Sequence, residues 1–140
     1  MALNPILATA AVNAEADAVT ALLDNGKLQI YDDTAPGQPA TADTAITFQV
    51  LLAEIGFETP TPFDPAVDGV AAIPNPITDT DADVTGTATW FRCLKSDNTP
   101  IFDGTVGVGG AYNLVLNSVA IQQHAAVTVT SFSFTAPKHA

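Results

Sequence analysis

Three aspartates alternate along the segment ITDTDADVTG, at Asp79, Asp81 and Asp83. This spacing is found at the start of calcium-binding loops, in which a glycine follows the third ligand and a glutamate closes the loop at its twelfth position. Here Val84 occupies the glycine position and Trp90 the twelfth position. The pattern favours a solvated acidic loop, with calcium binding as the weaker alternative. We expect no metal and no cofactor.

The remaining polar residues do not form a catalytic pattern. His124 falls in a predicted turn and His139 in the C-terminal tail, and neither has a cysteine, histidine or paired carboxylate at ligand or triad spacing. Asp32 and Asp33 are adjacent on a predicted strand end, so their side chains point to opposite faces. There is no glycine-rich phosphate loop. We therefore predict that the chain is not an enzyme.

Aromatic residues offer one possible ligand site. Tyr31, Trp90, Phe91 and Tyr112 could together form an exposed platform for sugars, as in many β-sandwich modules. The single tryptophan of a small sandwich is more often a core anchor. We favour the core interpretation and keep the platform as an alternative.

Composition limits the possible partners. The chain has 140 residues, enough for one domain with a core, and only 14% are charged, against about 25% in an ordinary soluble domain. Four basic residues against 15 acidic ones give a formal net charge of -11, which argues against binding nucleic acid or an anionic membrane surface. The single cysteine, Cys93, cannot form an internal disulfide and is predicted to be a small buried hydrophobe. With no apolar run long enough to span a membrane and no charged signal-peptide start, we expect synthesis in a cytoplasm.

Residues 1–25 are predicted to form an arm and one short helix. Asn13 is the expected N-cap, and Asn25 with Gly26 the stop signal. The apolar face of the helix is expected to comprise Ala16, Val19, Leu22 and Leu23. Two roles stay open, a cover over the rest of the domain or an arm that orders against a neighbour.

Residues 26–137 read as a single domain of short strands. Period-two patterns predict strands over residues 27–32, with Leu28 and Ile30 inward, and over 46–54, with Ile46, Phe48, Val50 and Leu52 inward. Between residues 57 and 76 lies a proline-rich connection with an Asp68-Gly69 turn and a short strand at 70–73.

The second half of the chain predicts a hairpin. Residues 87–95 and 100–106 pair around Asp97 and Asn98, which places Arg92 opposite Asp103 in a modest ion pair and Phe91 over Gly104. Further strands are predicted at 114–121 and 127–134. About seven or eight short strands with closely spaced turns indicate an all-β fold, an antiparallel β-sandwich of jelly-roll or immunoglobulin-like type.

Several motifs together resemble a family of small virion structural proteins of tailed bacteriophages. They are the Ala-rich helix leading into Gly26, Leu28, Ile30, Tyr31 and Asp32, the strand Thr85 to Arg92, and the hairpin Phe102 to Gly107. The resemblance covers roughly residues 14–137. Asp33 stands where the family often has glycine, so that turn is expected to differ.

The resemblance implies a head decoration or cement protein on the outer surface of the capsid. Its implied partners are the major capsid protein and further copies of itself, with a homotrimer as one possibility. Apolar residues of the N-terminal segment and of the 57–77 loop would then form the contacts: Leu3, Pro5, Ile6, Leu7, Phe57, Pro60, Pro62, Phe63 and Ile73.

Two other functions remain as alternatives. One is a tail or fibre-associated module that meets host glycans through Tyr31, Trp90 or Tyr112. The other is a non-viral extracellular adhesin module, against which the absence of a signal-peptide pattern argues weakly.

Overall fold

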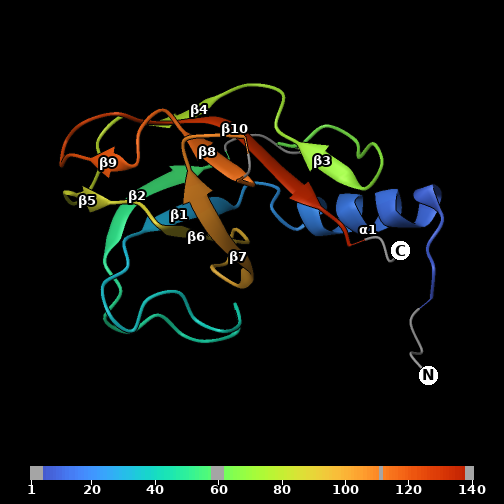
Figure 1. The fold of residues 1–140 in the computed structure, drawn as a ribbon, viewed down its shortest axis with the longest axis horizontal. Helices are drawn as coiled ribbons and strands as arrows, with labels where there is room; N and C mark the ends of the chain where they lie inside the picture. The colour runs from blue at the N-terminus through green and yellow to red at the C-terminus, as the bar shows by residue number, and fades with distance from the viewer. Residues whose placement is uncertain (1–4, 58–61, 111, 138–140) are drawn as a thin grey trace.

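A computed structural model describes residues 5–57, 62–110 and 112–137 and shows a mostly β fold with one helix (Figure 1). The helix α1 lies near the N-terminus, and short strands follow along the rest of the chain. The elements are α1 Thr9–Ala21, β1 Lys27–Tyr31, β2 Leu51–Gly56, β3 Val70–Ala72, β4 Ile77–Asp79, β5 Gly86–Thr87, β6 Trp90–Leu94, β7 Pro100–Gly107, β8 Leu114–Leu116, β9 Ala120–Ile121 and β10 Val127–Thr135.

Most of the strands form one curled sheet. Its order is β2-β1-β6-β7-β8-β10-β3, with β4 also paired to β10, while β5 and β9 form a separate small ladder. The β7–β8 ladder is parallel and pairs Val106 with Leu114 and Gly107 with Val115. The prediction of an entirely antiparallel arrangement is therefore wrong at this ladder. A parallel ladder requires the chain to return to the start of the paired segment before the second strand begins. Here the paired segment is only two residues long, so the short connection 108–113 is sufficient.

The predicted division into two separate sheets, as in a jelly roll or an immunoglobulin domain, is not confirmed, because seven strands are hydrogen-bonded in one path and β4 joins the same sheet through β10. Strand β1 matches its prediction, and Leu28 and Ile30 are fully buried. The turn at Asp68 and Gly69 is confirmed as well, since both residues have positive φ between the bridged Val67 and Val70.

The predicted strand 46–54 begins only at Leu51, and its inward-facing assignment fails at Phe48, which is 80% exposed. The physical reason is the length of the neighbouring strand. Tyr31, the last residue of β1, pairs with Leu51, so residues 46–50 find no partner in this ladder. The predicted strand 114–121 is likewise interrupted, at Ser118, whose hydroxyl accepts a hydrogen bond from the backbone N–H of Ala120.

The helix begins earlier than predicted. Ala8 is its N-cap and makes no side-chain capping bond, whereas Asn13 lies inside the helix, where its Oδ1 accepts a hydrogen bond from the Gly69 N–H at 2.7 Å. Asp17 Oδ1 accepts one from the Ala66 N–H at 2.8 Å. These two side chains hold the proline-rich connection against α1.

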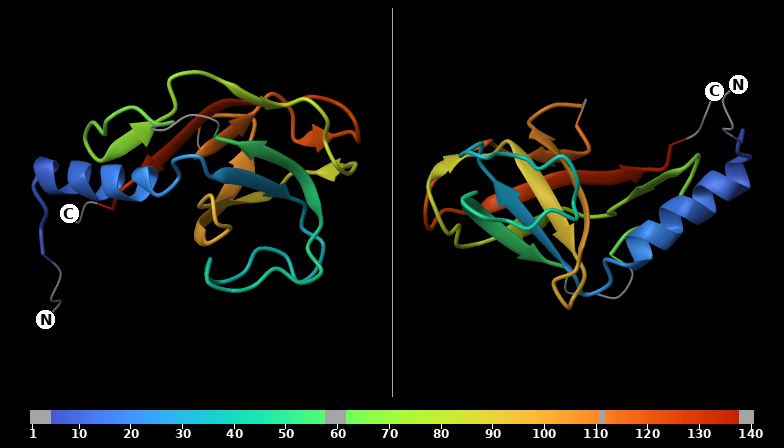
Figure 2. Two further views of the ribbon diagram at one scale, coloured as in Figure 1. Left: turned by 180° about the vertical axis from the view of Figure 1, so that it is seen from behind. Right: turned by 90° about the horizontal axis from the view of Figure 1, so that it is seen from below.

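Only a narrow stripe of α1 is buried, at Val12, Ala16 and Thr20. Leu22, predicted to face inward, is 44% exposed. Figure 2 shows why: α1 lies beside β3 and the end of β10, beyond the main body of the sheet, so it has little surface to cover.

Phenylalanines from distant segments make the centre of the core. Phe132 on β10 has its ring centroid 5.3 Å from that of Phe91 on β6 and 5.4 Å from that of Phe63. The predicted pairing of Phe91 with Gly104 is confirmed, and a Cβ on Gly104 would lie 2.6 Å from the Phe91 ring. The two ends of the curled sheet thus enclose one core.

Candidate partner-binding surface

A row of polar side chains crosses the face of the sheet opposite the phenylalanine core. The strand register aligns Glu54, Gln29, Arg92 and Asp103 on β2, β1, β6 and β7. Arg92 donates from Nε to Asp103 Oδ1 at 2.7 Å and from Nη2 to Oδ2 at 2.9 Å. The two side chains are only 3% and 6% exposed. The predicted pair is therefore confirmed in register, but it is buried and bidentate rather than a modest surface pair.

The long loop 32–50 is fastened to this face (Figure 1). Arg92 donates a third hydrogen bond, from Nη1 to the Thr44 carbonyl at 2.8 Å. Trp90 donates from its indole Nε1 to the Asp32 carbonyl at 2.9 Å and stacks on Tyr31 with 4.5 Å between the ring centroids. These contacts are charge-assisted or aromatic and mostly shielded from water, so the loop is held in a defined position.

One aromatic side chain of this loop points into solvent. Gln49 is buried, donates from Nε2 to the Gly37 carbonyl at 3.0 Å, and accepts the Thr47 N–H at 2.8 Å on Oε1. Phe48 lies between these two fixed neighbours and is 80% exposed. The loop therefore presents a phenyl ring whose backbone is ordered before any partner binds, as an anchor residue requires.

The predicted contact residues fall into four groups. Pro5 and Ile6 are exposed, Ile6 by 82%, and Leu7, Pro62 and Ile73 are half-buried. Phe57 and Phe63 are buried in the core, where they pack on Phe132, so in the folded monomer they do not form a contact surface. Leu3 and Pro60 lie outside the described residues.

The correction at Phe57 and Phe63 has a clear cause. Phe57 directly follows β2, and its N–H donates to the Gly26 carbonyl at 2.9 Å, which keeps its ring against the core. After Phe63, the N–H groups of Ala66 and Gly69 donate to Asp17 and Asn13, so the segment that carries Phe63 lies against α1. The exposed apolar residue of this connection is Val67 instead, at 72%. Val67 sits in a segment without a periodic pattern, and the period-two pattern around Phe48 predicted an inward side chain, so the sequence did not indicate the exposure of either residue.

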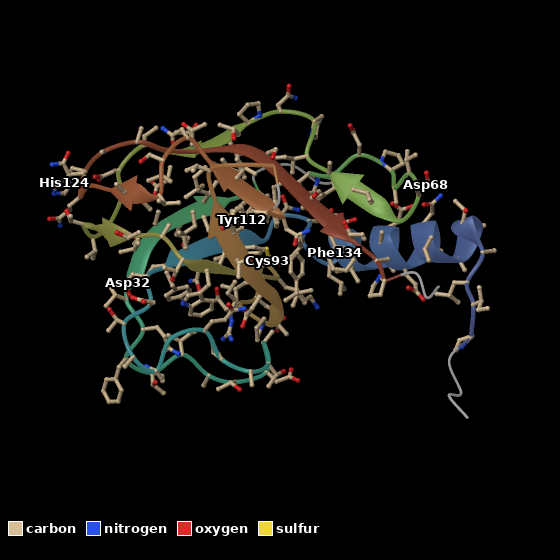
Figure 3. All side chains as sticks on the ribbon, viewed as in Figure 1. Asp32, Asp68, Cys93, Tyr112, His124 and Phe134 are labelled. Carbon is tan, nitrogen blue, oxygen red and sulfur yellow. The ribbon has the colours of Figure 1, made fainter. Side chains whose placement is uncertain are left out.

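The aromatic platform is not assembled. Trp90 and Tyr31 are 1% and 3% exposed and Phe91 is fully buried, so the core interpretation of Trp90 is confirmed. Burial also raises the pKa of Tyr31. Tyr112, labelled in Figure 3, is 45% exposed and covers Gly107 on β7, and none of the ring contacts among the described residues joins it to Tyr31, Trp90 or Phe91.

Trp90 gives a spectroscopic test of this arrangement. Because it is the chain's single tryptophan and is buried, we expect blue-shifted native emission that iodide quenches only weakly. Unfolding in guanidinium should shift the emission to longer wavelength and restore quenching. Strong quenching of the native protein would show that the ring is accessible and would reopen the glycan-platform alternative.

Two of the three alternating aspartates, Asp79 and Asp81, form hydrogen bonds or ion-pair contacts within the chain. Asp79 accepts the Asp81 N–H at 2.9 Å on one carboxylate oxygen and the Glu54 N–H at 3.2 Å on the other. Asp81 contacts His124 at 2.7 Å, at the exposed end of the molecule opposite α1 (Figure 3). Among the described residues no group of three or more histidine, cysteine, aspartate or glutamate side chains is arranged to hold a metal ion. His139 lies outside the described residues.

Cys93 is buried as predicted, and burial raises the pKa of its thiol well above the ordinary value of 9.0. The folded chain therefore keeps the thiol proton at pH values where the unfolded chain loses it. Stability is unaffected below about pH 9 and falls above it, by up to about 1.4 kcal/mol per pH unit for one such group.

We expect the urea midpoint to fall less steeply between about pH 8 and about pH 10 in Cys93→Ala than in the unmodified protein, since the variant lacks this titrating group. Other alkaline titrations, including that of Tyr31, are common to both proteins and cancel in the comparison. Parallel pH profiles for the two proteins would contradict the assignment.

Within the described ranges, no helix is both long and apolar enough to cross a bilayer. No protein-family model, curated protein or solved structure matches this chain.

Proposed function

We propose that the protein is a non-enzymatic structural component of a tailed-bacteriophage virion, a decoration or cement protein on the outer surface of the head. The observation that carries this proposal is Phe48, an aromatic side chain that is 80% exposed on a loop held in place by the buried Gln49 and Arg92. An exposed aromatic side chain on a fixed backbone is the kind of residue that serves as an anchor in protein interfaces.

The charge of the chain supports the same placement. A net charge of -11 disfavours contact with packaged nucleic acid and with anionic membranes, so the protein would bind the outside of the container, at junctions between major capsid proteins. Each such contact is small, and the symmetry of the head multiplies its effect. The mostly β fold, whose curled sheet brings Phe91 on β6 against Phe132 on β10, is compatible with this role.

The alternative, a tail or fibre module that binds glycans, has less support. Of the three rings considered for it, only Tyr112 is accessible, and one half-exposed ring gives a weak platform.

The test is an add-back experiment with virion heads that lack this protein. Purified protein should bind them saturably and raise the temperature at which they release DNA. Phe48→Asp should weaken binding at least tenfold, whereas Val108→Asp, a matched change at another exposed apolar residue, should bind as the unmodified protein does. Failure of the folded protein to bind heads would contradict the proposal, and equal binding by Phe48→Asp would remove Phe48 as the anchor.

A further inference from the structure

Strand β2 ends the sheet and leaves part of its backbone edge open. The Phe57 N–H donates to the Gly26 carbonyl on the β1 side at 2.9 Å, so by alternation the N–H and C=O groups of Leu52, Glu54 and Gly56 point away from β1. The first part of this edge is occupied, because the Leu52 carbonyl accepts the Asp83 N–H and the Glu54 N–H donates to Asp79 Oδ2. Among the described residues, the Glu54 carbonyl and the Gly56 N–H have no hydrogen-bond partner, and they form the open part.

A groove of about 480 Å³ runs along this open edge, between β2 and β4. We call it the edge groove. Its apolar lining includes Phe57, Ile73 and Ile77, and its polar flank includes Glu54 and Asp79. A Cβ on Gly56 would meet nothing within 4 Å, so there is open space beside the edge. An unpaired edge next to apolar pockets is the geometry in which an extended peptide adds a strand to a sheet.

An apolar segment of the same chain is only partly covered by its own domain, because Leu7 packs against the core whereas Pro5 and Ile6 are exposed. Residues 5–8 precede α1 without regular secondary structure, Ala8 is extended at φ -72 and ψ 157, and Ile6 is 82% exposed. Figures 1 and 2 show this arm leaving the far end of α1, away from the sheet. The first acidic residue of the sequence is Glu15, so the arm adds no carboxylate to a groove that already has two at its flank.

The arm cannot fill the edge groove of its own molecule. The Gly56–Phe57 end of the groove lies next to Gly26, at the C-terminal end of α1. The 13 residues of α1 separate that end from the arm by about 20 Å. Ile6 is three residues from the first residue of α1, a reach of about 10 Å. With α1 intact, Ile6 can enter only the groove of another molecule.

We propose that the edge groove receives the N-terminal arm, residues 5–8, of a second copy of this chain. The arm pairs with the open edge of β2 at Glu54 and Gly56, and Ile6 enters the apolar lining beside Phe57 and Ile73. Because arm and groove are different surfaces, the contact is head-to-tail, and repetition of it closes a ring or extends a chain. This inference does not depend on the virion role, since it concerns only contacts between copies of the protein.

Light scattering after size exclusion, from micromolar to millimolar protein, tests the proposal. The unmodified protein should gain mass with concentration, more strongly at high salt because the -11 charges on the copies are screened. Ile6→Asp should stay monomeric, and Val108→Asp should associate as the unmodified protein does. A monomer at every concentration, or association unchanged in Ile6→Asp, would overturn the proposal.

The variant Gly56→Pro tests the pairing at the groove, because it removes the backbone N–H that points outward from the edge of β2. Proline should be tolerated at this position, because φ of Gly56 is not positive and a Cβ there would meet no atom within 4 Å. Its circular dichroism and melting temperature should match those of the unmodified protein, while association is lost. Normal association by a folded Gly56→Pro would contradict the pairing at β2.

Mixed disulfide formation tests the partners directly and does not depend on the proline variant. Two variants are prepared separately: Ile6→Cys, with a thiol on the arm, and Asn75→Cys, with a thiol in the lining of the groove. The native Cys93 should not interfere, because it is buried. A heterodisulfide should form on mixing the two, and much less of it when Val108→Cys replaces Asn75→Cys. Absence of the heterodisulfide, or cross-linking of Ile6→Cys only to a capsid protein in virions, would show that the arm has a different partner.

Discussion

Replacing Arg92 with leucine is expected to lower the free energy of unfolding by about 3–5 kcal/mol, because it leaves the Asp103 carboxylate buried without its partner. Asp103 is 6% exposed and receives both of its guanidinium hydrogen bonds from Arg92. The variant also loses the hydrogen bond to the Thr44 carbonyl, so loop 32–50 should become susceptible to proteolysis before the rest of the chain. Urea denaturation and limited proteolysis measure the two effects.

The double variant Arg92→Leu with Asp103→Leu separates the effect of the unpaired carboxylate on stability from the release of loop 32–50. It removes the uncompensated charge, so most of the lost stability should return, while the loop remains released because Thr44 still lacks its donor. If the double variant is as unstable as Arg92→Leu alone, the loss comes from packing on Trp90 rather than from the buried ion pair.

Replacing Phe132 with alanine is expected to cost about 3–5 kcal/mol. The ring is 1% exposed and packs against rings from several other segments, including Phe63, Phe91 and Phe102. Its removal leaves a cavity at the point where the two ends of the sheet meet. The measurement is the urea midpoint together with binding of an exposed-hydrophobe dye.

Phe48→Ala is the matched control, because the same side-chain change is made at a residue that is 80% exposed. We expect its free energy of unfolding to stay within about 0.5 kcal/mol of that of the unmodified protein. Similar losses in the two variants would mean that Phe48 is packed in solution and would remove the main support for it as an anchor.

The sequence predicted best where contacts are local. The pairs Arg92 with Asp103 and Phe91 with Gly104 lie in a single hairpin, as predicted. Next to the turn the strands are one residue out of this register, and an irregularity between Cys93 and Leu94 restores it. The pairing of these residues was predicted from the sequence. The burial of the ion pair was not predicted, because it depends on loop 32–50, a distant segment that packs over Arg92.

The candidate surface was predicted less well, because it depends on distant contacts. Phe48 follows the same alternation as a buried strand, and its exposure results from the end of β1 at Tyr31, which no pattern around residue 48 encodes. Phe57 and Phe63 were expected at the surface, yet both are held inward by contacts distant in sequence. The Phe57 N–H donates to the Gly26 carbonyl, and after Phe63 the N–H groups of Ala66 and Gly69 donate across 49 and 56 residues of sequence to Asp17 and Asn13. Pro5 and Ile6 of the arm were predicted as part of the contact set that the family resemblance implies, and both are exposed.

The central claim is that this protein sits on the outside of a phage head. The most direct measurement is electron microscopy of purified virions labelled with a gold-tagged antibody against the chain. The account predicts label scattered over the whole head, with none on heads from a phage in which the protein is deleted. Label confined to the tail or its tip would contradict the decoration role and favour the glycan-binding alternative, and virions without any label would exclude an exposed virion protein.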